Sequence, residues 1–200
     1  MPKISDEKRA ARRAQILNAA WTCFQKEGLH ATTMDDIIKA SGLSAGAVYS
    51  YFPGKSDLIL AAVTTSLTDL TALVLPLFSV SPPLSETELL RQITANVARF
   101  SMREGFDLRR IALLGWSEAQ RDDKLRATMN GFYQAFRARL VQAAEEWKKR
   151  TPDGASVSEE DVAKTLLALI LGFVVQSAIM GDVEPENLES GLDGLARLRG

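Results

Sequence analysis

The side chains best suited to bind another molecule lie in the run from Ser44 to Tyr51, which reads SAGAVYSY. Ser44 can cap a helix by accepting a hydrogen bond from a free backbone amide. The three residues that follow it are alanine, glycine and alanine, which are small enough to let the start of a helix come close to another backbone. Tyr49, Ser50 and Tyr51 then offer hydroxyl groups that can bond to phosphates or base edges. The run therefore predicts a short helix that reads DNA.

A second short helix is expected immediately upstream. Thr33 can cap it, with Asp36 at the capping-box position three residues later. Gly42 ends it, because glycine adopts the left-handed backbone that turns the chain at little steric cost. Two short helices separated by so tight a turn predict a helix-turn-helix, which places its second helix in the major groove of DNA.

A longer helix is expected from Lys55 to Leu75, before Pro76. A cation at the positive end of a helix is unfavourable unless both face the same anion. We therefore predict that Lys55 contacts a DNA phosphate, and that this helix connects the DNA-reading head to the rest of the chain.

The basic residues are concentrated at the same end. Residues 1–56 hold eight basic and five acidic residues, whereas the rest of the chain holds 16 and 20. A basic segment that directly precedes a DNA-reading unit favours phosphate contact, although a solvated helix end is the alternative. This segment contains Lys3, Lys8, Arg9, Arg12 and Arg13.

The run from Ile16 to Ile59, ILNAAWTCFQKEGLHATTMDDIIKASGLSAGAVYSYFPGKSDLI, resembles the N-terminal domain of TetR-type (tetracycline-repressor family) transcriptional regulators. The resemblance implies an all-α protein of about nine helices, with a DNA-binding domain at 1–54 and a helical ligand-binding and dimerisation domain at 55–200. Position 45 is often basic in this family and position 50 is often histidine, but here they are Ala45 and Ser50, so the operator sequence does not follow. The expected DNA contacts are Thr32, Thr33, Ser44, Ala45, Gly46, Ala47, Tyr49, Ser50, Tyr51 and Lys55.

The remaining composition argues against several other classes of protein. The only histidine, His30, is expected on the surface of the loop between the first two helices, which argues against a histidine-based metal cluster or a Ser-His-Asp triad within one chain, and we expect no enzyme, no metal and no cofactor. Gly54, Lys55 and Ser56 match the end of a phosphate-binding loop, but no strand precedes them. One cysteine and no signal peptide predict a cytoplasmic protein, and the longest apolar stretch, 165–175, is too short to span a membrane.

The C-terminal part reads as five further helices with a concentration of aromatic and methionine side chains. These could line a pocket for a small apolar or aromatic effector, and an ordinary hydrophobic core is the alternative. Three of them have polar tips that could orient a ligand. The expected ligand-binding residues are Phe100, Met102, Phe106, Trp116, Ser117, Met129, Phe132, Tyr133 and Phe136.

The helix that Ser158 caps and that reaches about Met180 is apolar nearly all round from Leu166 to Val175, which predicts burial on two sides. We expect it to form a four-helix dimer interface with the leucine stripe of the last helix, although burial within one chain is the alternative. The expected interface residues are Leu167, Ile170, Leu171, Val174, Ala178, Leu188, Leu192 and Leu195. The sequence thus predicts a homodimeric regulator that an effector releases from a palindromic operator in double-stranded DNA, and the resemblance implies that this regulator is a repressor. The competing hypothesis is a ligand-independent DNA-binding or architectural protein.

Overall fold

The structure, a computed structural model, describes residues 6–101, 108–150 and 157–198. Every regular element in these ranges is helical, so the expected all-α class is confirmed. The elements are α1 (Asp6–Ala31), α2 (Met34–Ser41), α3 (Ala45–Tyr51), α4 (Lys55–Val74), the 3₁₀-helix η1 (Leu75–Ser79), α5 (Glu86–Ser101), α6 (Leu108–Glu118), α7 (Asp123–Arg150), α8 (Glu159–Ile179) and α9 (Pro185–Arg197).

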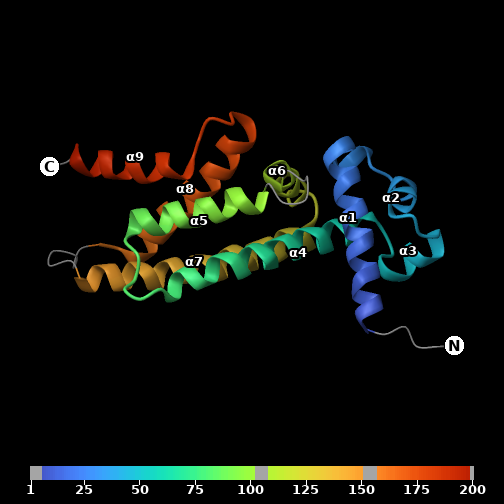
Figure 1. The fold of residues 1–200 in the computed structure, drawn as a ribbon, viewed down its shortest axis with the longest axis horizontal. Helices are drawn as coiled ribbons and strands as arrows, with labels where there is room; N and C mark the ends of the chain where they lie inside the picture. The colour runs from blue at the N-terminus through green and yellow to red at the C-terminus, as the bar shows by residue number, and fades with distance from the viewer. Residues whose placement is uncertain (1–5, 102–107, 151–156, 199–200) are drawn as a thin grey trace.

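The molecule is elongated, with α1, α2 and α3 grouped as a head at one end (Figure 1). α1 carries an apolar stripe that includes Ile16, Ala20 and Phe24, each of them fully buried. Val48 from α3 and Ile37 from α2 pack into the same core. One side of each short helix is therefore fixed against α1, which leaves the other side for contact with a partner.

The ends of the two short helices are formed as the sequence predicts. Thr33 and Asp36 form a complete capping box, in which the Thr33 hydroxyl accepts from the Asp36 amide at 3.2 Å. The Thr33 hydroxyl and then the Thr33 amide donate to the Asp36 carboxylate, at 2.6 and 2.9 Å, and these two bonds lower the pKa of that carboxyl. Gly42 has a φ of 67°, in the left-handed region that favours glycine, and the Ser44 hydroxyl accepts from the Ala47 amide. The helix-turn-helix is thus specified by local hydrogen bonds.

Beyond the head, α4 and α7 run along the length of the molecule, and α9 lies at the opposite end (Figure 1). α8 packs against α5, α6 and α7, and α9 packs against α5. Two groups of buried side chains form the interior, one centred on the head and the other on α5 and α8. Trp116 of α6 packs against both groups, so it connects the core of the head to the core of the body.

Two segments, Lys55–Ser79 and Glu159–Ile179, are long and apolar enough to cross a membrane by length and composition. The longest uninterrupted apolar stretch, 165–175, is shorter than either segment and therefore did not reveal them. Each is a helix of the bundle, because α4 contacts α1, α5 and α7 while α8 contacts α5, α6 and α7. Core helices commonly satisfy the same two criteria, so these criteria alone assign neither helix to a membrane.

Candidate DNA-binding and effector sites

The surface of α3 presents several of the groups that were expected to read DNA. Ala45, Gly46, Ser50 and the cap residue Ser44 are exposed. Tyr49 is 46% exposed, which is unusual for a large side chain with an aromatic ring. A tyrosine held outward on the second helix of a helix-turn-helix can reach a base edge or a phosphate.

Two other side chains on this helix are less available than the sequence suggested. Tyr51 is half-buried and packs against the core of the head. The Ser50 hydroxyl donates to the Ala47 carbonyl oxygen at 2.6 Å, and Ala47 itself is half-buried. The ring of Tyr51 therefore supports the head, while Ser50 keeps only its acceptor lone pairs for a partner.

The two threonines before α2 differ in their roles. Thr32 is fully buried, and its hydroxyl donates to the Gly28 carbonyl oxygen at 2.7 Å. The expectation that Thr32 contacts DNA is therefore wrong, because the side chain is enclosed by its own domain. Thr33 is exposed at the start of α2, where its hydroxyl belongs to the capping box. The sequence gives no sign of this difference, because which threonine faces the core depends on how α2 packs against α1.

Lys55 occupies an unexpected position. Its ammonium donates to the carbonyl oxygens of Leu29, His30 and Thr32 at 2.9, 3.2 and 3.0 Å. These are free carbonyl groups at the end of α1, where a cation complements the negative end of the helix. Lys55 thus fastens the first turn of α4 to the last turn of α1. An ammonium has three protons, so a phosphate would have to share or replace one of these bonds.

Basic side chains on α1 extend the positive surface of the head. Arg9, Arg12 and Arg13 are exposed, and the guanidinium of Arg13 lies 5.4 Å from the centre of the Phe52 ring. The amide of Gln15 donates to the Ser41 carbonyl oxygen at 2.8 Å, which holds the first helix against the end of α2. Lys3 lies outside the described residues. The exposed arginines are placed to contact phosphates beside the helix-turn-helix.

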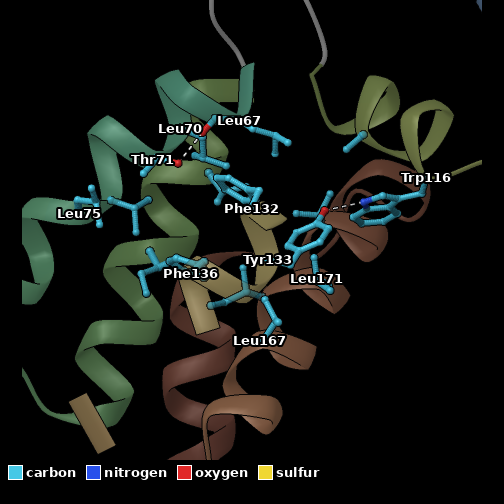
Figure 2. A pocket seen from close by; sticks show the side chains of 16 residues that line it. Leu67, Leu70, Thr71, Leu75, Trp116, Phe132, Tyr133, Phe136, Leu167 and Leu171 are labelled. Carbon is cyan, nitrogen blue, oxygen red and sulfur yellow. Dashed lines mark hydrogen bonds between the residues drawn. The ribbon is translucent and has the colours of Figure 1, made fainter. Parts of the chain in front are cut away.

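The body contains an apolar cavity of about 110 Å³ between α4, α5, α6, α7 and α8 (Figure 2). Four of the expected ligand-binding residues line it, namely Trp116, Phe132, Tyr133 and Phe136. Phe132 lies edge-on to Tyr133 and stacks on Phe136, with ring centres 5.5 and 6.4 Å apart. This arrangement gives flat aromatic walls, which suit an apolar or aromatic molecule.

A second cavity of about 90 Å³ adjoins the first and shares Leu67, Leu70, Trp116 and Tyr133 with it. Its lining includes Trp21 of α1, which is 8% exposed and belongs to the core of the head. The wall of this cavity is therefore partly made by the DNA-binding unit.

Two further expected ligand residues, Phe100 and Met129, line the second cavity and not the first. Ser117 is exposed and lines neither cavity as described, so these cavities do not support its expected role, whereas Trp116 lines both. Met102 and Phe106 lie outside the described residues. The sequence reasoning missed the walls contributed by α4 and α8. Those of α4 are Leu67, Leu70, Thr71 and Val74, followed by Leu75 of η1, and those of α8 are Leu167, Ile170, Leu171 and Val174.

The polar tips that line the first cavity are already paired. The indole N–H of Trp116 donates to the Tyr133 hydroxyl at 2.7 Å (Figure 2). Burial raises the pKa of Tyr133, and this hydrogen bond partly opposes the effect. The Thr71 hydroxyl donates to the Leu67 carbonyl oxygen at 2.7 Å, within α4. A ligand in the first cavity would therefore meet carbon surface almost everywhere.

The predicted dimer residues are divided between the interior and the surface. Ile170 and Val174 are 5% and 9% exposed and belong to the body's own core. Leu167 and Leu171 line the first cavity, so the part of α8 that was assigned to a partner faces its own chain. Leu188 and Leu192 pack partly against the same core, and Ala178 is half-buried. Of the predicted residues only Leu195 is strongly exposed, at 60%.

Other apolar side chains at this end are exposed without having been predicted. Ile179 is 69% exposed, Met180 is 63% and Leu198 is 84%. Together with Leu195 they place exposed apolar area on the end of α8 and on α9. Periodicity could not identify the exposed side chains of α8, because a helix that is apolar nearly all round does not indicate which face its own chain will cover.

The described residues contain no group of three histidine, cysteine, aspartate or glutamate side chains that could hold a metal ion.

His30 lies 3.7 Å from a carboxylate oxygen of Glu118, across the junction between α1 and α6. Burial raises the pKa of the half-buried Cys23 thiol, which disfavours the reactive thiolate.

The head has three helices, and α3, the second helix of its helix-turn-helix, is exposed. The long helix α4 joins this head to a body that contains an apolar cavity. Such an arrangement defines a helix-turn-helix DNA-binding regulator. Residues 16–62 match the protein family described as "Bacterial regulatory proteins, tetR family". Residues 86–196 match the protein family described as "BetI-type transcriptional repressor, C-terminal". The chain belongs to the TetR family of bacterial regulatory proteins, and its body is of the BetI type.

Curated relatives agree with this assignment. The HTH-type regulator YfiR of Bacillus subtilis is 39% identical over 66 residues, which covers 33% of this chain and 32% of the relative. The match thus spans about a third of that protein's length. The regulator BetI of Agrobacterium fabrum is 26% identical over 184 residues, which covers 90% of this chain and 84% of the relative.

Solved structures share the fold along nearly the whole chain. Salmonella enterica GusR has a TM-score of 0.71 and 27% identity, covering 97% of this chain and 98% of GusR. A transcriptional regulator from Saccharomonospora viridis, solved in complex with choline, has a TM-score of 0.75 and 19% identity, covering 94% and 96% of the two chains.

Proposed function

We propose that this protein is a cytoplasmic, homodimeric transcriptional repressor that releases a palindromic operator when a small apolar or aromatic effector fills its cavities. The observation that carries the proposal is the position of the cavities. Both share Leu67 and Leu70 of α4, and the second also touches Trp21 of the head. A ligand there would press directly on the elements that orient the reading helix.

The coupling would run through α4. Its first residue, Lys55, holds the end of α1 by three hydrogen bonds, so a shift of α4 would pull on the head. Two heads on a palindromic site must meet major grooves about 34–36 Å apart, so a small rotation of each head would misplace both. An effector needs only to bind the misplaced arrangement more tightly than the DNA-bound one.

The dimer would use the exposed ends of α8 and α9. Ile179, Met180, Leu195 and Leu198 are exposed apolar side chains that a second copy could cover. An isologous contact of this kind would hold two heads at a fixed spacing, as a palindrome requires. Regulators of this family act as dimers, and the same arrangement is proposed for this chain.

The test begins with a selection of binding sites from random duplexes by the full-length protein. Fluorescence anisotropy then measures affinity for the selected and for a scrambled duplex, with and without small aromatic compounds. We expect at least about a thousandfold preference for the selected site at physiological salt. Equal affinity for both duplexes would instead support a ligand-independent architectural protein, and a stable complex that no cavity-binding compound weakens would contradict the effector mechanism.

A further inference from the structure

The second cavity differs from the first in one respect, which is a charged side chain in its wall. Arg109, in the first turn of α6, lines the second cavity together with Ser66 of α4. It is the one charged residue among the described residues that line either cavity. The combined space therefore has an aromatic end, formed by Phe132 and Phe136, and a cationic end at Arg109.

We propose that the effector is an amphipathic acid, with an aromatic or alkyl body in the first cavity and a carboxylate bound by Arg109 in the second. This inference rests on the proposed effector function and specifies its ligand class. A guanidinium has five N–H donors in a fork that matches a carboxylate, so Arg109 can hold an acid beside the interaction that it already makes.

The dimensions fit such a molecule. The first cavity, about 110 Å³, is of the same order as an engineered cavity of about 150 Å³ that holds benzene. The second, about 90 Å³, adds room for a short chain and a carboxylate. Trp116 and Tyr133 line both, so one ligand can extend from one cavity into the other along these two side chains.

The positive charge of Arg109 in the cavity wall favours an acidic ligand over a cationic or a neutral one. The aromatic rings could hold a quaternary ammonium group by cation–π attraction, as a choline-like ligand would require. A cation in the second cavity would face the positive Arg109, however, and the described lining offers no carboxylate to balance it. A neutral molecule could accept hydrogen bonds from the guanidinium, but without the added strength of a bond between two charged groups. An anion is the charge state that this lining favours.

Isothermal titration calorimetry on the full-length protein tests the proposal with three probes that share one ring and chain length: 3-phenylpropionate, 3-phenylpropanol and 3-phenylpropyltrimethylammonium. We expect the acid to bind at least about tenfold more tightly than the alcohol, because hydrogen bonds to a charged group are the strong ones. The ammonium compound should bind no better than the alcohol. R109Q should bring acid and alcohol to within about twofold of each other.

R99Q is the matched control, because Arg99 is an exposed arginine on α5 that lines neither cavity. It removes the same charge and should keep the preference for the acid. Equal binding of acid and alcohol by the wild type would overturn the proposal even if R109Q failed to fold, and so would a preference that survives R109Q.

The outcomes also separate this inference from the proposed function. Acid binding that depends on Arg109 but never weakens the operator complex would contradict the effector mechanism and leave the carboxylate site intact. Operator release by acid and alcohol at equal concentrations would contradict the carboxylate site and leave the effector mechanism intact.

Discussion

Replacing Lys55 by methionine tests how α4 is fastened to the head. The substitution keeps the aliphatic stem but removes the three hydrogen bonds to the carbonyl oxygens of Leu29, His30 and Thr32. Hydrogen bonds to a charged group contribute about 1.5–3 kcal/mol each, but one ammonium and its desolvation are shared here, so we expect a total loss of about 2–4 kcal/mol. For a chain of this size that corresponds to a fall in Tm of about 5–10 °C.

Differential scanning calorimetry measures this loss. Lys26→Met is the control, because Lys26 is an exposed lysine on α1, the helix whose end Lys55 contacts, and its only described ionic contact is with the neighbouring Glu27, at 3.3 Å. It should change the Tm by no more than about 1–2 °C. A Lys55→Met protein as stable as the wild type would refute the reasoning.

The same variant distinguishes the observed contact from the phosphate contact that the sequence predicts for Lys55. Each phosphate bound by a cation contributes about 0.9 to the slope of log affinity against log salt concentration. If Lys55 only positions the head, Lys55→Met should weaken operator binding equally at all salt concentrations. A slope that becomes shallower by about 0.9, with stability unchanged, would support the phosphate role instead.

Three further predictions concern the body. Leu195→Glu should shift the protein toward a monomer in sedimentation equilibrium, because Leu195 is exposed and carries no core contact that the charge would disrupt; an unchanged dimer would place the interface elsewhere. Trp116→Phe should lower the free energy of unfolding by about 1–2 kcal/mol in chemical denaturation, since Tyr133 loses its hydrogen-bond donor, and an unchanged value would show that this bond adds nothing. Hydrogen bonds from Arg91 and then Gln92 lower the pKa of Glu88 from 4.5 to about 2. This stabilisation is present above about pH 4.5 and disappears as the pH falls toward 2, so Glu88→Gln should flatten the acid side of the stability profile, and a parallel profile would contradict it.

The sequence by itself determined the DNA-reading unit, because local signals specify it. The capping box of Thr33 and Asp36, the left-handed Gly42 and the cap at Ser44 each depend on residues within a few positions of one another. The helix bounds in the body also follow from caps and breaks along the chain. For the same reason Tyr49 could be recognised as an outward reading group, since its neighbour Val48 supplies the inward contact.

Only the tertiary structure decided which long-range partner each side chain meets. Lys55 reaches the carbonyl oxygen of Leu29, 26 positions away, which no local pattern encodes. The faces of α8 were ambiguous because the helix is apolar nearly all round, and packing against α5, α6 and α7 turned Ile170 and Val174 into its own core. The cavity walls from α4 and the position of Trp21 beside them arise from helices that are distant in sequence. Their meeting depends on how whole helices cross, which the order of residues in any one helix does not fix.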